Sequence, residues 1–223
     1  MNNYPADINV FKKISYFITN NIKYLIILFS FIFLVFIIFQ FFSIYSSSKI
    51  QQNSIVFFNA QNTDQPEVIK KTLKDLSDKK DFYGTLAKLQ LIDINFRKEN
   101  YEDSIELYYE IMEDNNLDNV YKSAIAVKAS FQFINLNFEN LSDNFLSTIE
   151  KLISYINDDL ESYHGFKLEL VYLTHILSVQ KNNLDYKNDL KAIDKYNEIM
   201  NSELTSSSTK ERIKKIHEFF YYN

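Results

Sequence analysis

Residues 104–112 read SIELYYEIM, and residues 192–200 read AIDKYNEIM. Five of the nine positions are identical, including the tyrosine at the fifth position and the Glu-Ile-Met at the end. A third segment, TIEKLISYI at residues 148–156, starts 44 residues after the first and 44 residues before the last. Two equal spacings, with a shared opening of a small residue, isoleucine and an acidic residue, argue against a chance resemblance. The sequence therefore predicts a structural repeat.

The segments around these three copies have the apolar spacing of amphipathic helices. The chain holds only two glycines and two prolines in 223 residues, whereas β-hairpins and phosphate-binding loops depend on glycine. We therefore expect an all-α domain in which the three copies are the second helices of successive helix–turn–helix units, stacked to bury their apolar faces. The expected pairs are 81–97 with 101–114, 119–136 with 145–156, and 164–180 with 186–201.

Two further helices flank these pairs in the prediction. Residues 66–76, PEVIKKTLKDL, open with proline at the first turn, and either Asp64 or Gln65 is the expected cap. The last helix covers 208–222, and Ser208 and Thr209 are its expected caps because their hydroxyl groups suit the first amides of a helix.

A second decisive feature is the absence of charge from Tyr24 to Ser48, where the centre reads LIILFSFIFLVFIIFQFF. Sixteen of the 18 residues from 25 to 42 are Leu, Ile, Val or Phe, and together they favour bilayer insertion by about 5–10 kcal/mol. A cleaved signal peptide would have a shorter apolar region, of about 7–15 residues. We expect a single transmembrane helix, followed by a stalk and an exported helical domain. The predicted boundaries are a tail over 1–23, an anchor over 24–45, a stalk helix over 46–63 and the domain over 64–223.

The flanking charges predict the orientation of this anchor. Lys12, Lys13 and Lys23 precede the span, whereas only Lys49 follows it closely, and the basic side of a span stays in the cytoplasm. We therefore expect the C-terminal domain in the periplasm of a bacterial inner membrane. Three of the chain's 24 basic and one of its 29 acidic residues lie in the tail, which leaves 21 against 28 after it. That balance disfavours nucleic acid as a partner.

The repeated segments resemble the second helix of a tetratricopeptide repeat. The pattern is a small residue, an aromatic residue four positions on and an apolar residue three positions later, although the 44-residue spacing exceeds the usual 34 or so. The resemblance implies a tetratricopeptide-like α-solenoid, with these residues packing successive repeats. The residues that fit this packing are Ser104, Tyr108 and Ile111, then Ala192, Tyr196 and Ile199, together with Tyr83 and Gly84 at the start of a first helix.

The layout of the whole chain is more specific. A short tail, one anchor, a stalk and then FYGTLAKLQLIDINFRKENYEDSIELYYEIM at residues 82–112 resemble the YfgM-like family of anchored tetratricopeptide proteins. Tyr83, Gly84, Leu86 and Ala87 match the family's Tyr-Gly/Ala-x-Leu-Ala opening. The resemblance implies an ancillary subunit of the Sec translocon that associates with the channel and with a membrane-anchored periplasmic chaperone of the PpiD type. A scaffold for envelope assembly or cell division is the alternative.

No catalytic arrangement stands out in the sequence. His164, His175 and His217 lack the spacing of metal ligands, and the chain has neither cysteine nor a G-x-S-x-G nucleophile motif. We therefore expect no enzyme, no cofactor, no metal and no small-molecule substrate.

A binding face is expected instead on the first helices of the repeats, because these line the concave side of such solenoids. Lysines there could hold a carboxylate or an acidic peptide, although a solvated face is the simpler interpretation. The predicted partner-binding residues are Lys88, Asn95, Lys128, Gln132 and Asn135.

Overall fold

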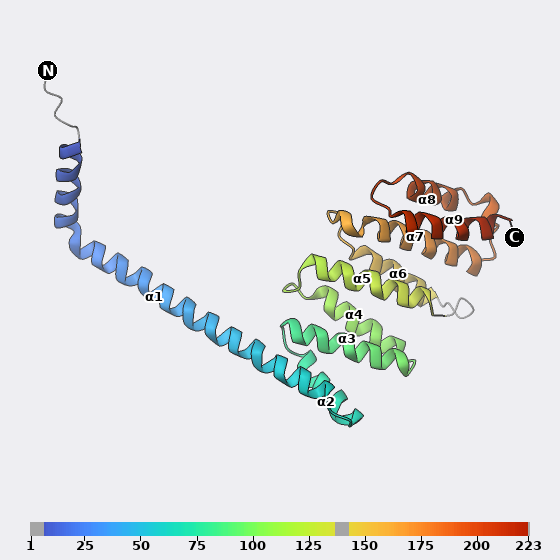
Figure 1. The fold of residues 1–223 in the computed structure, drawn as a ribbon, viewed down its shortest axis with the longest axis horizontal. Coiled ribbons are helices and arrows are strands. Elements are labelled where there is room, and N and C mark those ends of the chain that lie inside the picture. Colours follow the sequence, from blue (N-terminus) through green and yellow to red (C-terminus); the bar gives the residue numbers. More distant parts are fainter. Residues whose placement is uncertain (1–6, 137–142, 223) are drawn as a thin grey trace, which may run out of the picture. The chain divides into compact units, whose positions relative to one another are not determined.

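The computed structural model of the chain describes residues 7–136 and 143–222, and every regular element in these ranges is a helix (Figure 1). The expected all-α class is therefore confirmed. The chain divides into two compact units, residues 1–58 and 59–223, and each unit is described separately below.

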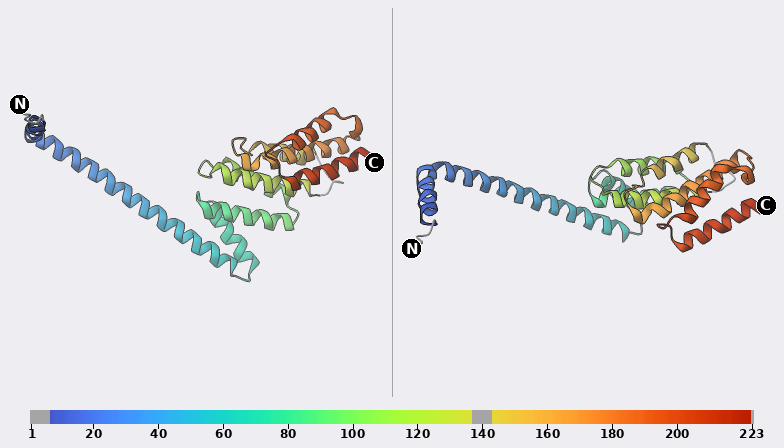
Figure 2. Two further views of the ribbon diagram at one scale, coloured as in Figure 1. Left: turned by 45° about the horizontal axis from the view of Figure 1, so that its top comes forward. Right: turned by 90° about the horizontal axis from the view of Figure 1, so that it is seen from above.

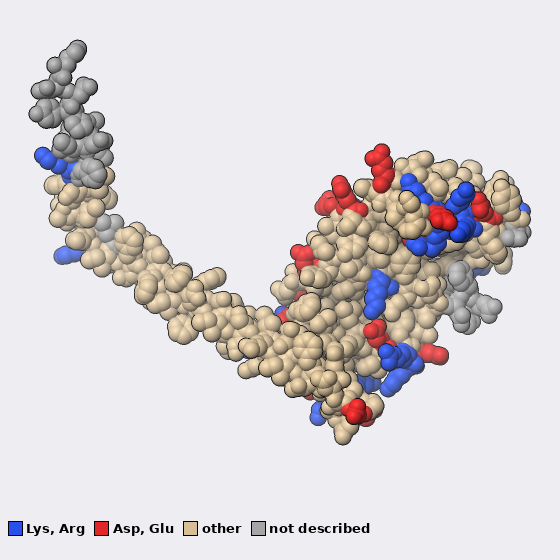
Figure 3. Space-filling model, in the orientation of Figure 1, with Lys and Arg blue, Asp and Glu red and all other residues tan. Residues whose placement is uncertain are grey.

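The first unit consists almost entirely of helix α1 (Asp7–Gln61), which continues into the second. Helix α1 bends sharply near its N-terminal end (Figures 1 and 2) but continues without interruption through the predicted limits of tail, anchor and stalk. The residues from 26 to 45 are all exposed, and Figure 3 shows the stretch that follows the N-terminal lysines as an uncharged surface. The part from Ile26 to Gln61 is long and apolar enough to cross a membrane. A single helix that is apolar on all sides has no stable place in water, so lipid or protein must cover it.

The second unit is a row of paired helices (Figures 1 and 2). Helix α3 packs between α2 and α4, α5 packs on α6, and α7 packs on α5, α6 and α8. The C-terminal helix α9 closes the row against α7 and α8. The helices are α2 (Pro66–Ser77), α3 (Phe82–Arg97), α4 (Tyr101–Glu113), α5 (Asn119–Ile134), α6 (Asp143–Ser154), α7 (Glu161–Lys181), α8 (Leu190–Asn201) and α9 (Ser207–Tyr222), with a short 3-10 helix, η2 (Tyr186–Asn188), before α8.

The three repeated segments occupy corresponding places in this row, in α4, α6 and α8. Their first residues, Ser104, Thr148 and Ala192, are 0%, 3% and 0% exposed, so a small side chain lies at a close helix contact each time. Four positions on, Tyr108 is fully buried, whereas Tyr196 is only half-buried. The second apolar positions also lie inside: Ile111 and Ile199 are 1% and 0% exposed.

Two hydrophobic clusters hold the pairs together. The larger cluster joins α3, α4, α5, α6 and one side of α7 around Phe133, whose ring meets Phe96 and Tyr108 edge to face. The smaller cluster joins α7, η2, α8 and α9 around Tyr172, Tyr186 and other residues described below. Helix α7 contributes to both clusters, so the row has a continuous core.

Gly84 is required by the close approach of α3 to the end of α2. A Cβ atom at this position would lie 1.9 Å from the carbonyl oxygen of Lys79 and 3.2 Å from that of Leu76. The Gly84 amide donates to Oδ1 of the N-cap residue Asp81 at 3.0 Å, which fixes the start of α3 at this contact. Neighbouring Tyr83 is half-buried.

Some expected element limits are wrong. Helix α9 begins at Ser207, one residue before its predicted start. Ser206 is its cap, since its hydroxyl oxygen accepts from the Thr209 amide at 3.2 Å, whereas the predicted caps Ser208 and Thr209 lie inside the helix and Ser208 is exposed. Helix α8 begins at Leu190 because Asp189 caps it, so Tyr186 lies in η2. Of the two residues expected to cap α2, Gln65 occupies the N-cap position, and its side chain makes no capping hydrogen bond. Most of the break expected over 137–144 lies outside the described residues.

Candidate partner-binding surfaces

Two of the predicted partner-binding residues, Lys88 and Asn95, lie on the side of α3 that faces α4. The Lys88 ammonium pairs with the Glu110 carboxylate of α4 at 2.6 Å, and its side chain is 18% exposed. Asn95 is buried at 6% exposure. Its backbone oxygen accepts from the amides of Lys98 and Asn100 as α3 ends. Asn95 therefore has a structural role at the turn into α4.

The other three predicted residues lie on α5 and just after it. Lys128 forms a long pair with Asp93 of α3, at 3.5 Å, and both side chains are about half exposed. Gln132 bonds through its side-chain oxygen to the hydroxyl of buried Tyr108. Burial raises the pKa of the Tyr108 hydroxyl, with Asp93 adding to the rise, so this tyrosine is a permanent donor. Asn135 is exposed and caps α5.

These five residues do not form one continuous surface. Lys128 pairs with Asp93 of α3, which precedes Asn95 by two positions. Side chains two positions apart point about 200° away from each other around a helix, so Asp93 and Asn95 lie on nearly opposite sides of α3. Lys88 and Asn95 therefore face α4, while Lys128 faces a different side of α3. The structure brings Lys128 and Gln132 together on α5 and separates them from the first two.

A groove runs along the second unit where Lys88 and Asn95 lie. It consists of two adjoining hollows of about 430 and 470 Å³, both lined by Ser77, Asp78 and Glu110. One wall belongs to α2 and the residues after it and is basic apart from Asp78, and the opposite wall is acidic and belongs to α4. A partner segment in this groove would need acidic groups on one side and basic groups on the other. The charged residues lining it include Lys70, Lys74, Lys79, Lys80, Asp103, Glu106 and Glu113.

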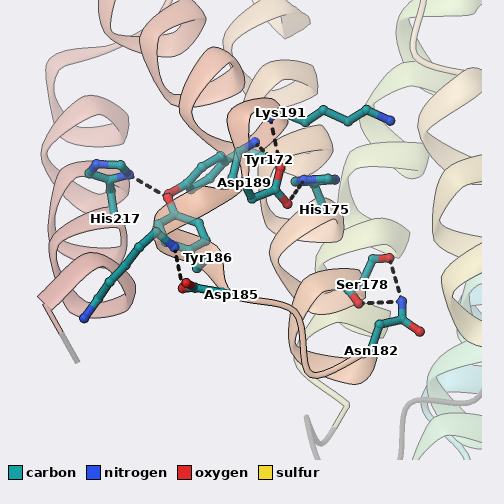
Figure 4. Close-up of polar contacts among 11 residues, drawn as sticks. Tyr172, His175, Ser178, Asn182, Asp185, Tyr186, Asp189, Lys191 and His217 are labelled. Atoms are coloured by element: carbon teal, nitrogen blue, oxygen red, sulfur yellow. Dashed lines mark hydrogen bonds and ion pairs between the residues drawn. The ribbon is translucent and has the colours of Figure 1, made fainter.

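A polar cluster at the C-terminal end joins α7, η2 and α9 (Figure 4). The Tyr172 hydroxyl lies 2.6 Å from that of Tyr186, which lies 2.6 Å from Nδ1 of His217. Burial raises the pKa of both tyrosines, and the hydrogen bond to Tyr186 raises that of Tyr172 further. These shifts agree with an arrangement in which the Tyr172 hydroxyl donates to Tyr186 and the Tyr186 hydroxyl donates to Nδ1 of neutral His217. Tyr196 of α8 stacks on the His217 ring, with 3.9 Å between ring centroids.

A second histidine, His175, holds the start of α8. Its Nε2 lies 2.9 Å from Oδ2 of Asp189, while Oδ1 of Asp189 accepts from the amides of Lys191 and Ala192. Burial raises the pKa of Asp189, but the bonds from Ala192 and His175 outweigh it and lower that pKa overall. In the described part of the chain, no serine hydroxyl bonds to His175. The contacts of His175 and Asp189 are those of a pair that caps helix α8.

Acidification is expected to loosen α9. Burial lowers the pKa of His217 below its usual value of about 6.5, with neighbouring Glu218 opposing the shift. The unfolded chain therefore takes up this proton first, and stability falls as the pH drops below about 6.5, by at most about 1.4 kcal/mol per pH unit. Protonated His217 would also leave the Tyr186 hydroxyl proton without an acceptor. The protection factors of α9 amides, which compare observed exchange with the intrinsic rate at the same pH, should fall between pH 7.5 and 5.5.

The matched control for this pH effect is His217→Gln, which keeps a hydrogen-bond acceptor but has no proton to gain. Tyr186 of η2 and Tyr196 of α8 face His217 from other elements. Burial raises the pKa of Tyr186, so it stays neutral in this range, and the Asp189 effect is confined to pH below about 4. An equal fall of the protection factors in both proteins would contradict the role of His217.

An ion pair between a buried carboxylate and an arginine whose side chain is 51% exposed adds a second link between α7 and α9. Glu169 is 0% exposed, and Arg212 donates to its two carboxylate oxygens at 2.7 and 2.6 Å. The bond to Glu169 raises the pKa of Arg212, although burial opposes the rise. Sequence reasoning missed this pair. The available signal was that Glu169 lies on the same helical stripe as Gly165 and Tyr172, which are both buried.

No protein-family model, curated protein or solved structure matches this chain.

Proposed function

We propose that the chain is a non-enzymatic interaction scaffold, held in a membrane by α1. The observation that carries the proposal is the combination of an exposed apolar helix of membrane-spanning length with a separate unit of paired helices. The corresponding burial of Ser104, Thr148 and Ala192 supports the interpretation of these pairs as a degenerate tetratricopeptide-like solenoid. Solenoids of this kind present extended surfaces to other proteins.

The proposed location is the bacterial inner membrane. Lys12, Lys13 and Lys23 before the apolar stretch favour a cytoplasmic N-terminus, so the paired helices would lie in the periplasm. Lys49 stands over the ring of Tyr45 at 4.6 Å. Tyrosine and lysine side chains that lie side by side at the end of an apolar helix are typical of the membrane–water interface. This pair therefore supports an end of the span near Tyr45.

The partners proposed from the YfgM-like resemblance are subunits of the Sec translocon and a membrane-anchored PpiD-type chaperone. Photo-crosslinking in intact membranes, followed by mass spectrometry, tests this choice. With crosslinkers at exposed positions of α1 and of the groove, we expect translocon subunits and the chaperone among the products. Recovery of cell-division or outer-membrane assembly proteins without translocon subunits would favour the alternative scaffold role.

The predicted binding lysines can be tested in the same assay. In Lys88→Glu/Lys128→Glu, a carboxylate faces Glu110 in the groove and another faces Asp93, so capture of an acidic partner segment should fall by about fivefold or more. Lys214→Glu/Lys215→Glu on α9 makes the same change in net charge at exposed positions and serves as the control. If both double variants capture partners equally, the lysines of α3 and α5 do not form the binding face.

A further inference from the structure

A small pocket opens where the N-terminal ends of α3 and α5 meet. Phe82 and Thr85 of α3, Leu117 of the preceding loop and Tyr121 of α5 form its apolar lining. The Phe82 and Tyr121 rings meet edge to face with 6.3 Å between centroids, and they are 50% and 53% exposed. Exposed aromatic rings that flank a hollow are a typical anchor site at protein interfaces.

The rim of this pocket is acidic. Asp81, Asp114 and Asp118 line it together with Asn116, and no lysine or arginine does. Oδ1 of Asp114 accepts from the backbone and side-chain nitrogens of Asn116, and Oδ1 of Asp118 accepts from the Val120 amide at 2.8 Å. In the described part of the chain neither Asp114 nor Asp118 is paired with a basic side chain, and each keeps its second carboxylate oxygen for another donor.

The helix ends do not cancel this negative charge. Asp81 and Asp118 cap α3 and α5, and each helix N-terminus carries about half a positive charge. Even without counting Asp81, the carboxylates of Asp114 and Asp118 outweigh the N-terminus of α5 and leave about 1.5 negative charges at the mouth of an apolar hollow. A cationic group is therefore the complementary occupant.

The size of the pocket narrows the occupant further. Its volume of about 180 Å³ is below the roughly 300–1,000 Å³ of typical small-molecule sites, and it suits a single side chain. A guanidinium group stacks on aromatic rings and offers several donors to carboxylates, and arginine is enriched at the centres of interfaces. Its three-carbon stem would contact Leu117 and Thr85, and its head would meet the aspartates.

The geometry points to this pocket as the docking site for an arginine side chain of a partner protein, held between Phe82 and Tyr121 and paired with Asp114 and Asp118. That the arginine belongs to a partner protein rests on the proposed scaffold function. Recognition of the guanidinium group by the pocket does not rest on that function. The pocket assignment and the scaffold function can therefore be refuted separately.

Binding of a minimal probe tests the site. The full chain is placed in nanodiscs of zwitterionic phosphatidylcholine, and saturation-transfer NMR measures binding of Nα-acetyl-arginine methylamide. The uncharged isostere, Nα-acetyl-citrulline methylamide, is the matched probe, and empty nanodiscs give the background. We expect the arginine probe to bind about tenfold or more tightly than the citrulline probe, because the bonds to the carboxylates are charge-assisted.

Two variants locate the binding. Asp114→Asn/Asp118→Asn keeps both local caps, since asparagine also caps helices, and should lower affinity for the arginine probe about tenfold. Asp158→Asn/Asp159→Asn removes the same charge from the loop between α6 and α7 and should leave it unchanged. Tyr121→Ala should also lose most binding, with helix content by circular dichroism as its folding control.

Three results would overturn the assignment: equal binding of both probes, no binding of either, or an equal loss in the two double aspartate variants. None of them affects the crosslinking test of the scaffold role. Conversely, arginine binding confined to the pocket in a chain that captures no partner would leave the site standing and refute the scaffold.

Discussion

Gly84→Ala is expected to destabilise the helical unit by about 3 kcal/mol, at the upper end of the usual cost of overpacking. The added methyl group would lie 1.9 Å from the Lys79 carbonyl oxygen. That oxygen belongs to the backbone and cannot turn away like a flexible side chain. The end of α2 must therefore separate from α3, and the Asp81 cap on the Gly84 amide is strained at the same time. Thermal unfolding followed by circular dichroism should show a midpoint lower by roughly 10 °C.

The second glycine of the chain provides the control. At Gly165 a Cβ would lie 3.0 Å from the Leu204 carbonyl oxygen and 3.1 Å from Cα of Thr205, a tight contact that a loop can relieve. Alanine in a helix interior also gains up to about 1 kcal/mol over glycine, so Gly165→Ala should stay within about 1 kcal/mol of the natural chain. Equal midpoints for the two variants would contradict the close α2–α3 contact.

Arg212→Ala is expected to cost about 3 kcal/mol, because it leaves the carboxylate of Glu169 buried without a cation. Helix α9 should be the first element to detach, since Arg212 links it to α7. Hydrogen exchange resolved by residue should show faster exchange in α9 than in α3 or α4, and the unfolding midpoint should fall.

A double variant separates the loss of a partner from the loss of the pair. Glu169→Met with Arg212→Leu removes both charges at once and should recover most of the stability, because apolar pairs of similar size often replace buried ion pairs without cost. Lys215→Ala, which breaks only an exposed pair with Glu211, should change stability by less than about 0.5 kcal/mol. A double variant as unstable as Arg212→Ala would show that the site needs polar groups.

Much of the fold follows from short-range features of the sequence. The scarcity of glycine and proline and the helical spacing of apolar residues predict the paired helices, and the copies at Ser104, Thr148 and Ala192 do lie in α4, α6 and α8. Gly84 stands out as a glycine inside a helical pattern. The need for glycine at this position comes from the nearby carbonyl oxygen of Lys79. That contact could not be predicted from the sequence, because it depends on how closely α2 approaches α3.

The candidate surfaces were harder to predict because they depend on which side of each helix meets a neighbour. Lys88 and Lys128 both suit a solvated first helix, yet they face different sides of α3 through Glu110 and Asp93. The pocket at Phe82 and Tyr121 joins residues 39 positions apart in the sequence, and no local pattern relates them. The same holds for Glu169 and Arg212.

Cysteine labelling tests the central claim most directly, since the chain has no cysteine of its own. Single Lys13→Cys and Ser208→Cys variants are treated with a membrane-impermeant maleimide in intact spheroplasts, and the membranes are then washed with alkaline carbonate. We predict that Ser208→Cys is labelled in intact spheroplasts and that Lys13→Cys is labelled only after the membrane is opened. Both proteins should stay in the membrane pellet after the carbonate wash. Release by carbonate, or a Ser208→Cys variant that is labelled only after lysis, would contradict a membrane anchor with the paired helices on its outer side.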